Sequence, residues 1–119
     1  MITNNSCEKI TVAEALARLP GPQGELSVSV FEHGSLVVKL YTPHRDDPQT
    51  PHSRDEVYVV ASGSGEFVYG GGGGGRQAFS LHDVLFAAAG VEHRFENFSE
   101  DFAVWVFFYG PEGGEVDRS

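Results

Sequence analysis

The chain is poor in basic residues and in cysteine. Its 119 residues include 8 Lys and Arg against 17 Asp and Glu, a formal net charge of −9 at pH 7. This charge repels a phosphate backbone, so we expect no nucleic-acid partner. Cys7 is the single cysteine, which excludes an internal disulfide and a thiolate metal cluster.

Long apolar runs and targeting signals are also missing. The longest apolar stretch, residues 102–109, is far shorter than the roughly 20 residues of a membrane-spanning helix, so we expect no membrane partner. Residues 1–6 have neither the basic start nor the apolar run of a secretory signal. A cytoplasmic location is the default expectation.

The remaining composition is that of one folded domain. Hydrophobic residues make up 40% of the chain and aromatic residues 12%, enough apolar surface to offset the conformational entropy lost on folding. Thr11 and Glu14 have the spacing of a capping box, which predicts a short helix that continues to Leu19 and stops at Pro20. We assign residues 1–24 to an N-terminal segment that contains this helix.

From residue 25 the hydrophobic pattern changes to the period of two that is typical of strands. Eight or nine short strands at regular spacing predict an all-β sandwich or closed barrel over residues 25–110. The expected strands are 26–31, 36–41, 57–60, 66–69, 77–81, 84–87, 92–98 and 102–109.

Three other segments carry expectations. The strand 102–109 is apolar on both faces, and because one small barrel has difficulty covering both, we expect a homodimer interface there. The six glycines 70–75 fit no phosphate-binding motif and are interpreted as a hairpin loop. Residues 111–119 are expected to form a flexible tail.

Candidate metal ligands stand out among the histidines and acids. His52 and Glu56 lie four residues apart at the entry of one strand, and His93 lies on another. Two imidazoles and a carboxylate form a facial triad that suits a divalent metal such as Fe, Mn, Ni or Zn and leaves positions open for substrate. The alternative is that these are hydrogen-bonded surface residues.

The segments that contain these residues resemble the two conserved motifs of the cupin superfamily. In the first motif, G(X)5HXH(X)3-4E(X)6G, this chain has His52, Glu56 and Gly63 at the family's intervals. In the second, G(X)5PXG(X)2H(X)3N, it has Gly90, His93 and Asn97. The resemblance implies a jelly-roll β-barrel, with His52, Glu56 and His93 as metal ligands.

The chain also departs from these motifs. Thr50 replaces the family's first metal histidine, His44 and His82 stand at glycine positions, and Ala88 replaces the proline. The ligand set is thus one histidine short, and water, the Thr50 hydroxyl or His44 folding back from its loop are the alternatives for the missing position.

Four further residues in or beside the two motifs carry expectations. Tyr58 has the same strand parity as Glu56, so it either contacts substrate in the cavity or fills the core. Asn97 is expected to be a hydrogen-bonding residue at a strand end. Arg54 and Asp55 are pocket candidates, although charged residues at a turn are usually solvated.

Three functions are compatible with the sequence. A redox metal at the triad would support a dioxygenase that acts on a small organic substrate, and cupins with such activity cleave aromatic diols or oxidise thiols. A non-redox metal would support an isomerase, epimerase or lyase, with His44, His82 or Tyr58 as the base. The third possibility is a non-enzymatic ligand-binding barrel.

Overall fold

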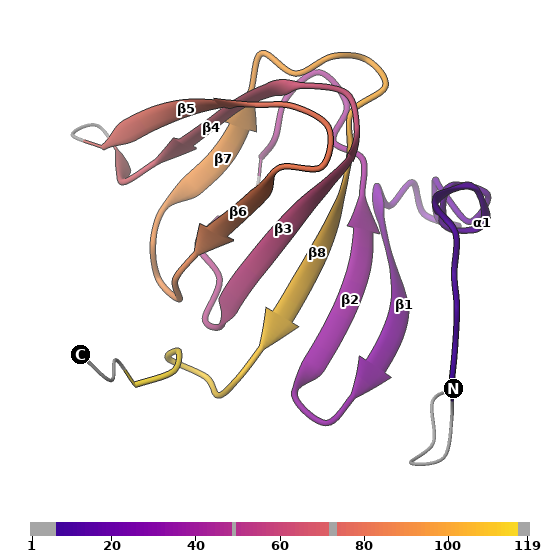
Figure 1. Ribbon diagram of the computed structural model, residues 1–119, viewed down its shortest axis with the longest axis horizontal. Coiled ribbons are helices and arrows are strands. Elements are labelled where there is room, and N and C mark those ends of the chain that lie inside the picture. Colours follow the sequence, from indigo (N-terminus) through magenta and orange to yellow (C-terminus); the bar gives the residue numbers. More distant parts are fainter. Residues whose placement is uncertain (1–6, 49, 72–73, 117–119) are drawn as a thin grey trace.

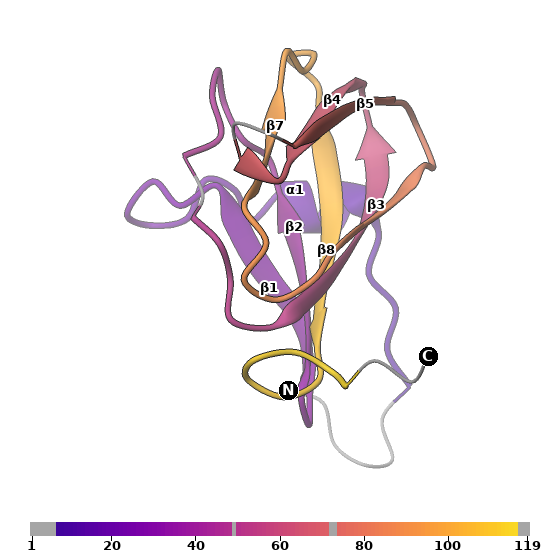
Figure 2. The ribbon, with the colours of Figure 1, turned by 90° about the vertical axis from the view of Figure 1, so that its left-hand side faces the viewer.

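The fold consists of two facing β-sheets with one short helix outside them (Figures 1 and 2). The computed structural model describes residues 7–48, 50–71 and 74–116. Within them the larger sheet has the order β1-β2-β8-β3-β6 and the smaller sheet the order β5-β4-β7. The elements are α1 (Val12–Leu16), β1 (Ser27–His33), β2 (Leu36–Tyr41), β3 (Asp55–Ser62), β4 (Gly65–Tyr69), β5 (Gly75–Phe79), β6 (Val84–Ala87), β7 (His93–Glu96) and β8 (Ala103–Tyr109).

The main core lies between the two sheets and is largely aromatic. Phe95 of β7 stands at its centre, with ring centroids of Phe79 and Phe102 at 5.6 and 5.0 Å. Edge-to-face contacts at such distances add to the hydrophobic free energy of burial. The predicted faces of β8 are confirmed here, because Val104 and Val106 are buried in this core. The all-β jelly-roll prediction is therefore confirmed.

Helix α1 covers part of the outer face of the larger sheet. The predicted capping box is present, with the Glu14 N–H donating to Thr11 Oγ1 at 3.1 Å and the Thr11 N–H to Glu14 Oε1 at 3.0 Å. Ala15 is fully buried against Leu40 and Ala103. The helix ends at Leu16 rather than Leu19, because the chain tightens into i→i−3 hydrogen bonds before Pro20.

Strand positions agree with the expectations to within a few residues, with two instructive differences. β1 continues to His33 and contains a bulge between Ser29 and Phe31, which puts Phe31 on the same face as Val28. β5 begins at Gly75, inside the glycine run, and pairs from there with Tyr69. β4 and β5 thus pair as a hairpin on either side of the run, as predicted, although Gly75 belongs to β5; Gly72 and Gly73 lie outside the described residues.

The segment after β8 returns to the sheet. The Gly113 N–H donates to the Ser53 carbonyl at 2.6 Å, and the Glu115 N–H donates to Asp55 Oδ2 at 2.8 Å. Residues 111–116, expected to be a flexible tail, are thus hydrogen-bonded to the entry of β3. None of the helices formed by the described residues is long and apolar enough to cross a membrane.

Candidate metal centre

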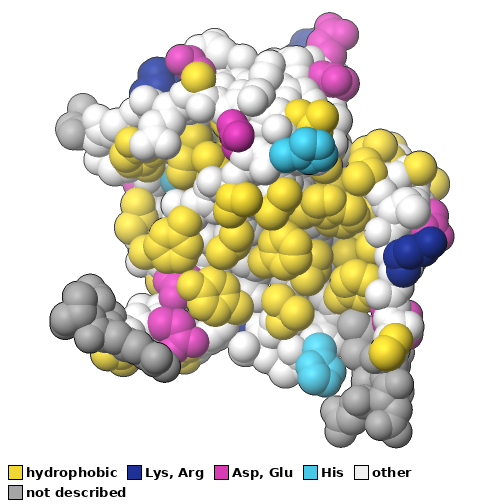
Figure 3. Space-filling view, viewed as in Figure 1, with side chains coloured by type: hydrophobic (Ala, Val, Ile, Leu, Met, Phe, Trp, Pro, Cys, Tyr) yellow, Lys and Arg dark blue, Asp and Glu magenta, His cyan; other side chains and the backbone are white. Residues whose placement is uncertain are grey.

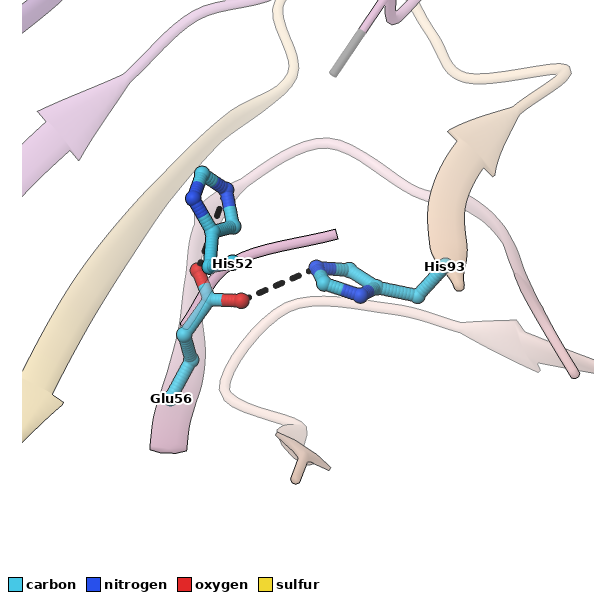
Figure 4. Close-up of side chains that lie close together, drawn as sticks. All are labelled: His52, Glu56 and His93. Atoms are coloured by element: carbon cyan, nitrogen blue, oxygen red, sulfur yellow. Dashed lines mark ion pairs between the residues drawn. The ribbon is translucent and has the colours of Figure 1, made fainter. Parts of the chain in front are cut away.

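Three predicted ligands, far apart in the sequence, meet between the two sheets (Figure 4). His52 lies just before β3, Glu56 is the second residue of that strand, and His93 is the first residue of β7. One ligand atom from each residue lies within 4.8 Å of the other two. The carboxylate of Glu56 stands between the imidazoles: Oε1 is 3.6 Å from His52 Nε2, and Oε2 is 3.0 Å from His93 Nε2.

Backbone hydrogen bonds explain why the two motif segments converge. The Gly90 N–H donates to the carbonyl of His52 at 2.8 Å, and the Ala89 N–H donates to Asp55 Oδ1 at 2.9 Å. Both donors belong to the connection between β6 and β7, which ends at His93. This connection is thereby fixed against the entry of β3, and the ligands of the two motifs are held at a defined separation.

Burial and charge make the pair of Glu56 and His93 a strong cation site. Their relative exposures are 1% and 3%. Burial alone would lower the pKa of His93, but the hydrogen bonds to Glu56 and to the Val91 carbonyl, with the charges of Glu56 and Asp47, raise this pKa above its ordinary value. A buried carboxylate needs a cation beside it, and a proton on His93 or a metal ion satisfies that need.

The imidazole of His93 is oriented as a metal ligand. Its Nδ1 lies 2.8 Å from the Val91 carbonyl, so Nδ1 carries the proton and Nε2 faces Glu56. A hydrogen bond from the second ring nitrogen to a carbonyl is the usual support of a metal-binding histidine. Two imidazoles and one carboxylate, with this tautomer fixed, fit a divalent first-row metal.

Tyr58 lies directly beside the ligands, as its strand parity predicts. It is 1% exposed, and its hydroxyl is 3.0 Å from Glu56 Oε1 and 2.9 Å from His93 Nε2. The ring also packs against Phe67 and Phe95. The core alternative is thus confirmed for the ring, and the hydroxyl lies beside the candidate ligands; contact with a substrate stays a prediction.

A cavity of about 210 Å³ opens on one side of the ligands. This is below the usual range of ligand pockets, which begins near 300 Å³, so it suits a small molecule. Its apolar wall includes Val106 and Phe108, and its polar lining includes Lys39 and Tyr41. His52, Glu56 and Tyr58 form the end where the ligands lie.

The residues considered for the missing fourth ligand lie elsewhere. Thr50 is exposed and is not among the residues that line the cavity. His44 lines a different hollow, beside α1 and Phe102, so the idea that it folds back to the metal is wrong. His82 is exposed in the connection between β5 and β6, where it adopts φ 75° at the position at which the cupin motif has glycine.

Asn97, Asp55 and Arg54 form hydrogen bonds that stabilise the strands and loops around the site. Asn97 donates to Glu66 Oε1 at 2.6 Å, which confirms it as a hydrogen-bonding residue at a strand end. Asp55 is buried rather than solvated, and hydrogen bonds from Glu115 and Ala89 lower its pKa. Arg54 donates to the Gly110 carbonyl at 3.1 Å. Arg54 and Asp55 are thus not pocket residues, because they hold the loops around the site.

Asp47 and Lys39 were missed by the sequence analysis. Asp47 lies in a polar, proline-rich loop, where a buried carboxylate is not expected, yet it is 6% exposed. Lys39 stands between the apolar residues Val38 and Leu40, and only its alternation with them signals that it faces the other side of β2.

Comparison with known proteins agrees with this geometry. The model of the Cupin domain family matches residues 37–109. An uncharacterized protein of Streptomyces coelicolor is 39% identical over 66 residues, which are 56% of this chain and 60% of that protein. The match thus spans less than two thirds of the relative's length.

Two crystal structures share the fold. A protein from Neisseria meningitidis has a TM-score of 0.67 at 17% identity, with 87% of this chain and 100% of that chain covered. Fe(II)-HppE with an alternative substrate has a TM-score of 0.56 at 15% identity, with 71% and 50% covered. The family match spans most of the barrel and both motifs, and the chain belongs to the cupin family.

Proposed function

We propose that this cupin binds one divalent metal through His52, Glu56 and His93 and is a dioxygenase that acts on a small organic substrate. The observation that carries the proposal is the convergence of these three side chains, two of which, His52 and Glu56, line one end of a small cavity. Three protein ligands leave coordination positions open, which is the arrangement used by non-haem iron oxygenases. The fold is shared with the Fe(II)-HppE structure, so such a barrel is compatible with iron.

The residues around the triad have separable roles in this proposal. A bound Fe(II) would supply the redox chemistry that lets an organic substrate react with dioxygen. Phe108 and Val106 exclude water from one wall of the cavity. The hydroxyl of Tyr58 donates to Glu56 Oε1 and lies 2.9 Å from His93 Nε2, so it would orient these two ligands at the end of the cavity that a substrate reaches.

The isomerase, epimerase or lyase alternative has less support. Such chemistry needs a general base near the substrate. Of the bases considered, His44 and His82 lie away from the cavity, and only Tyr58 lines it. The non-enzymatic ligand-binding alternative predicts no turnover with any metal.

The proposal is tested by metal analysis together with oxygen uptake. The purified protein, loaded anaerobically with Fe(II), should hold about one iron per chain and consume dioxygen with catechols or small thiols as trial substrates. The Zn(II)-loaded protein is the control and should consume none. Bound iron without oxygen uptake across these substrates contradicts the dioxygenase, and failure to retain any divalent metal contradicts the metal site as well.

We also propose that the outer face of the larger sheet forms a homodimer interface. Figure 3 shows apolar side chains gathered over the middle of this face. Strand pairing places two uncharged rows across it, and Val84 and Phe86 at the edge strand β6 are 66% and 56% exposed. An apolar patch of this kind on a chain of net charge −9 favours association with a second copy. The rows are Phe86, Val57, Phe107, Val38 and Phe31, and Val84, Val59, Trp105, Leu40 and Val28; α1 covers the second row at Trp105, Leu40 and Val28, so the patch open to a second copy lies toward β6.

Phe86→Glu is expected to convert a dimer into a monomer at micromolar concentration. The side chain is mostly exposed in the single chain, so the fold tolerates the substitution, whereas a carboxylate buried in an apolar interface is strongly unfavourable. Light scattering coupled to size-exclusion chromatography gives the mass. Val116→Glu, which adds the same charge at an 87% exposed site on the C-terminal segment, is the control and should remain dimeric. A wild-type protein that is monomeric throughout contradicts the interface.

A further inference from the structure

We propose that Lys39 binds a carboxylate group of the substrate and that the substrate is therefore a small organic acid. This inference rests on the proposed metal site, because the other end of the same molecule would face the end of the cavity that His52 and Glu56 line. A lysine projects from the inner face of a barrel sheet into the cavity beside the candidate metal ligands.

Strand register places Lys39 opposite the site. Lys39 pairs with Val106 of β8, and Val106 pairs with Tyr58 of β3, so the three residues form one row across the sheet. Neighbouring strands are about 4.8 Å apart, so the row places the Cα atoms of Lys39 and Tyr58 about 10 Å from each other. That span accommodates a small molecule with one end at the lysine and the other at the ligands.

Phe108 connects the two ends of the cavity. Its ring centroid lies 6.0 Å from Lys39 Nζ and 5.2 Å from the centroid of the His52 ring. One phenyl ring thus lies between the ammonium group and a metal ligand, and it offers an apolar surface for the body of the substrate. The arrangement matches a molecule with an anionic group, an apolar or aromatic middle and a metal-binding end.

The charge of Lys39 is available to a ligand. Among the described residues, none forms an ion pair with Lys39 within 4.0 Å. Of the described residues that line the cavity, it is the one Lys or Arg. A single ammonium group matches a monoanionic carboxylate better than a phosphate, for which proteins usually supply several donors.

A structural role for Lys39 is the competing explanation. Ser29 is its partner across the β1–β2 pair, and the Ser29 hydroxyl donates to Glu32 Oε2 at 2.9 Å. Lys39 could therefore balance the acidic side chain of Glu32, which binds the strand partner of Lys39, rather than bind a ligand. In that case its replacement would lower the stability of the protein and would not change which ligands it prefers.

Two matched probes separate these explanations. Calorimetric titrations compare 3,4-dihydroxybenzoate with 3,4-dihydroxybenzamide, which is neutral and of nearly the same shape, on both the Zn(II)-loaded and the metal-free protein. The wild type should bind the acid at least about tenfold more tightly than the amide, since a charge-assisted hydrogen bond contributes at least that factor. Lys39→Met should abolish the preference and leave amide binding unchanged, whereas Lys39→Arg should retain it. Lys9→Met, at an exposed position before α1, is the control and should behave as wild type.

The inference is overturned if the wild type shows no preference for the acid or binds neither probe, or if Lys39→Met keeps the preference. Measuring the metal content distinguishes a failure of the carboxylate site from a failure of the proposed metal site. Protein that binds zinc stoichiometrically but lacks the preference retains its metal site and loses the carboxylate site. Protein that takes no zinc but prefers the acid in its metal-free form loses the proposed function and retains the role of Lys39.

Discussion

His52→Ala and His93→Ala should each leave the protein without stoichiometric metal. Each substitution removes one of the three candidate ligands, and among the described residues no further histidine, cysteine or carboxylate joins their group. Loss of a residue that merely supports a ligand typically costs 10–100-fold in affinity, so loss of a ligand should cost at least about 100-fold. The measurement is elemental analysis after incubation with one equivalent of Fe(II) or Zn(II) and removal of free metal.

Two variants are used because the loss of His93 perturbs the fold more than the loss of His52, so loss of metal in both cannot be ascribed to misfolding. His93 is buried against Glu56, and its removal leaves that carboxylate without its partner. The side chain of His52 is 36% exposed, so the fold should tolerate its loss. His44→Ala, which removes an exposed histidine of the neighbouring loop, is the matched control and should bind metal as the wild type does. Unchanged metal content in His52→Ala and His93→Ala would exclude the triad.

The meeting of these candidate ligands was predicted from strand parity together with the resemblance to the two cupin motifs. Strand parity put Glu56 and Tyr58 on one face, and the motif intervals put His93 at the start of another strand. The parity of Glu56 and Tyr58 depends on a period of two that one strand imposes by itself, whereas His93 was found through its motif. The same reasoning identified both faces of β8, where Val104 lies in the main core and Trp105 lies with α1.

Features that depend on distant partners could not be predicted in this way. The bulge after Ser29 reverses the face of Phe31, and nothing in the local alternation announces it. Asp55 was expected to be solvated, but it is buried because Ala89 and Glu115 bring it two backbone donors. Lys39 is recognised as a candidate binding residue only when strand register places it across the sheet from Tyr58. In each case the missing information is long-range pairing.

Asp47→Ala should destabilise the protein by about 3 kcal/mol or more, because Asp47 joins the two sides of the barrel beside the site. Its Oδ2 accepts the Phe95 N–H at 2.9 Å, and its Oδ1 accepts the Tyr41 hydroxyl at 2.5 Å. Burial and the charge of Asp47 raise the pKa of Tyr41, so this phenol keeps its proton and donates it. Alanine would leave both donors without their acceptor, and a hydrogen bond to a buried charged group contributes about 1.5–3 kcal/mol.

Urea denaturation followed by tryptophan fluorescence measures the loss, since Trp105 is the single tryptophan of the chain. Asp46→Ala is the matched control, because the neighbouring side chain is exposed, and its stability should stay within about 0.5 kcal/mol of the wild type. Metal affinity should also fall in Asp47→Ala, since Phe95 lies two residues after His93 on β7 and its backbone is fixed by the same carboxylate. If Asp47→Ala unfolds at the wild-type urea concentration, the loop does not hold β7 in place, and the position of His93 is set instead by the pairing of β7 with β4 and by the hydrogen bonds of Gly90 and Ala89.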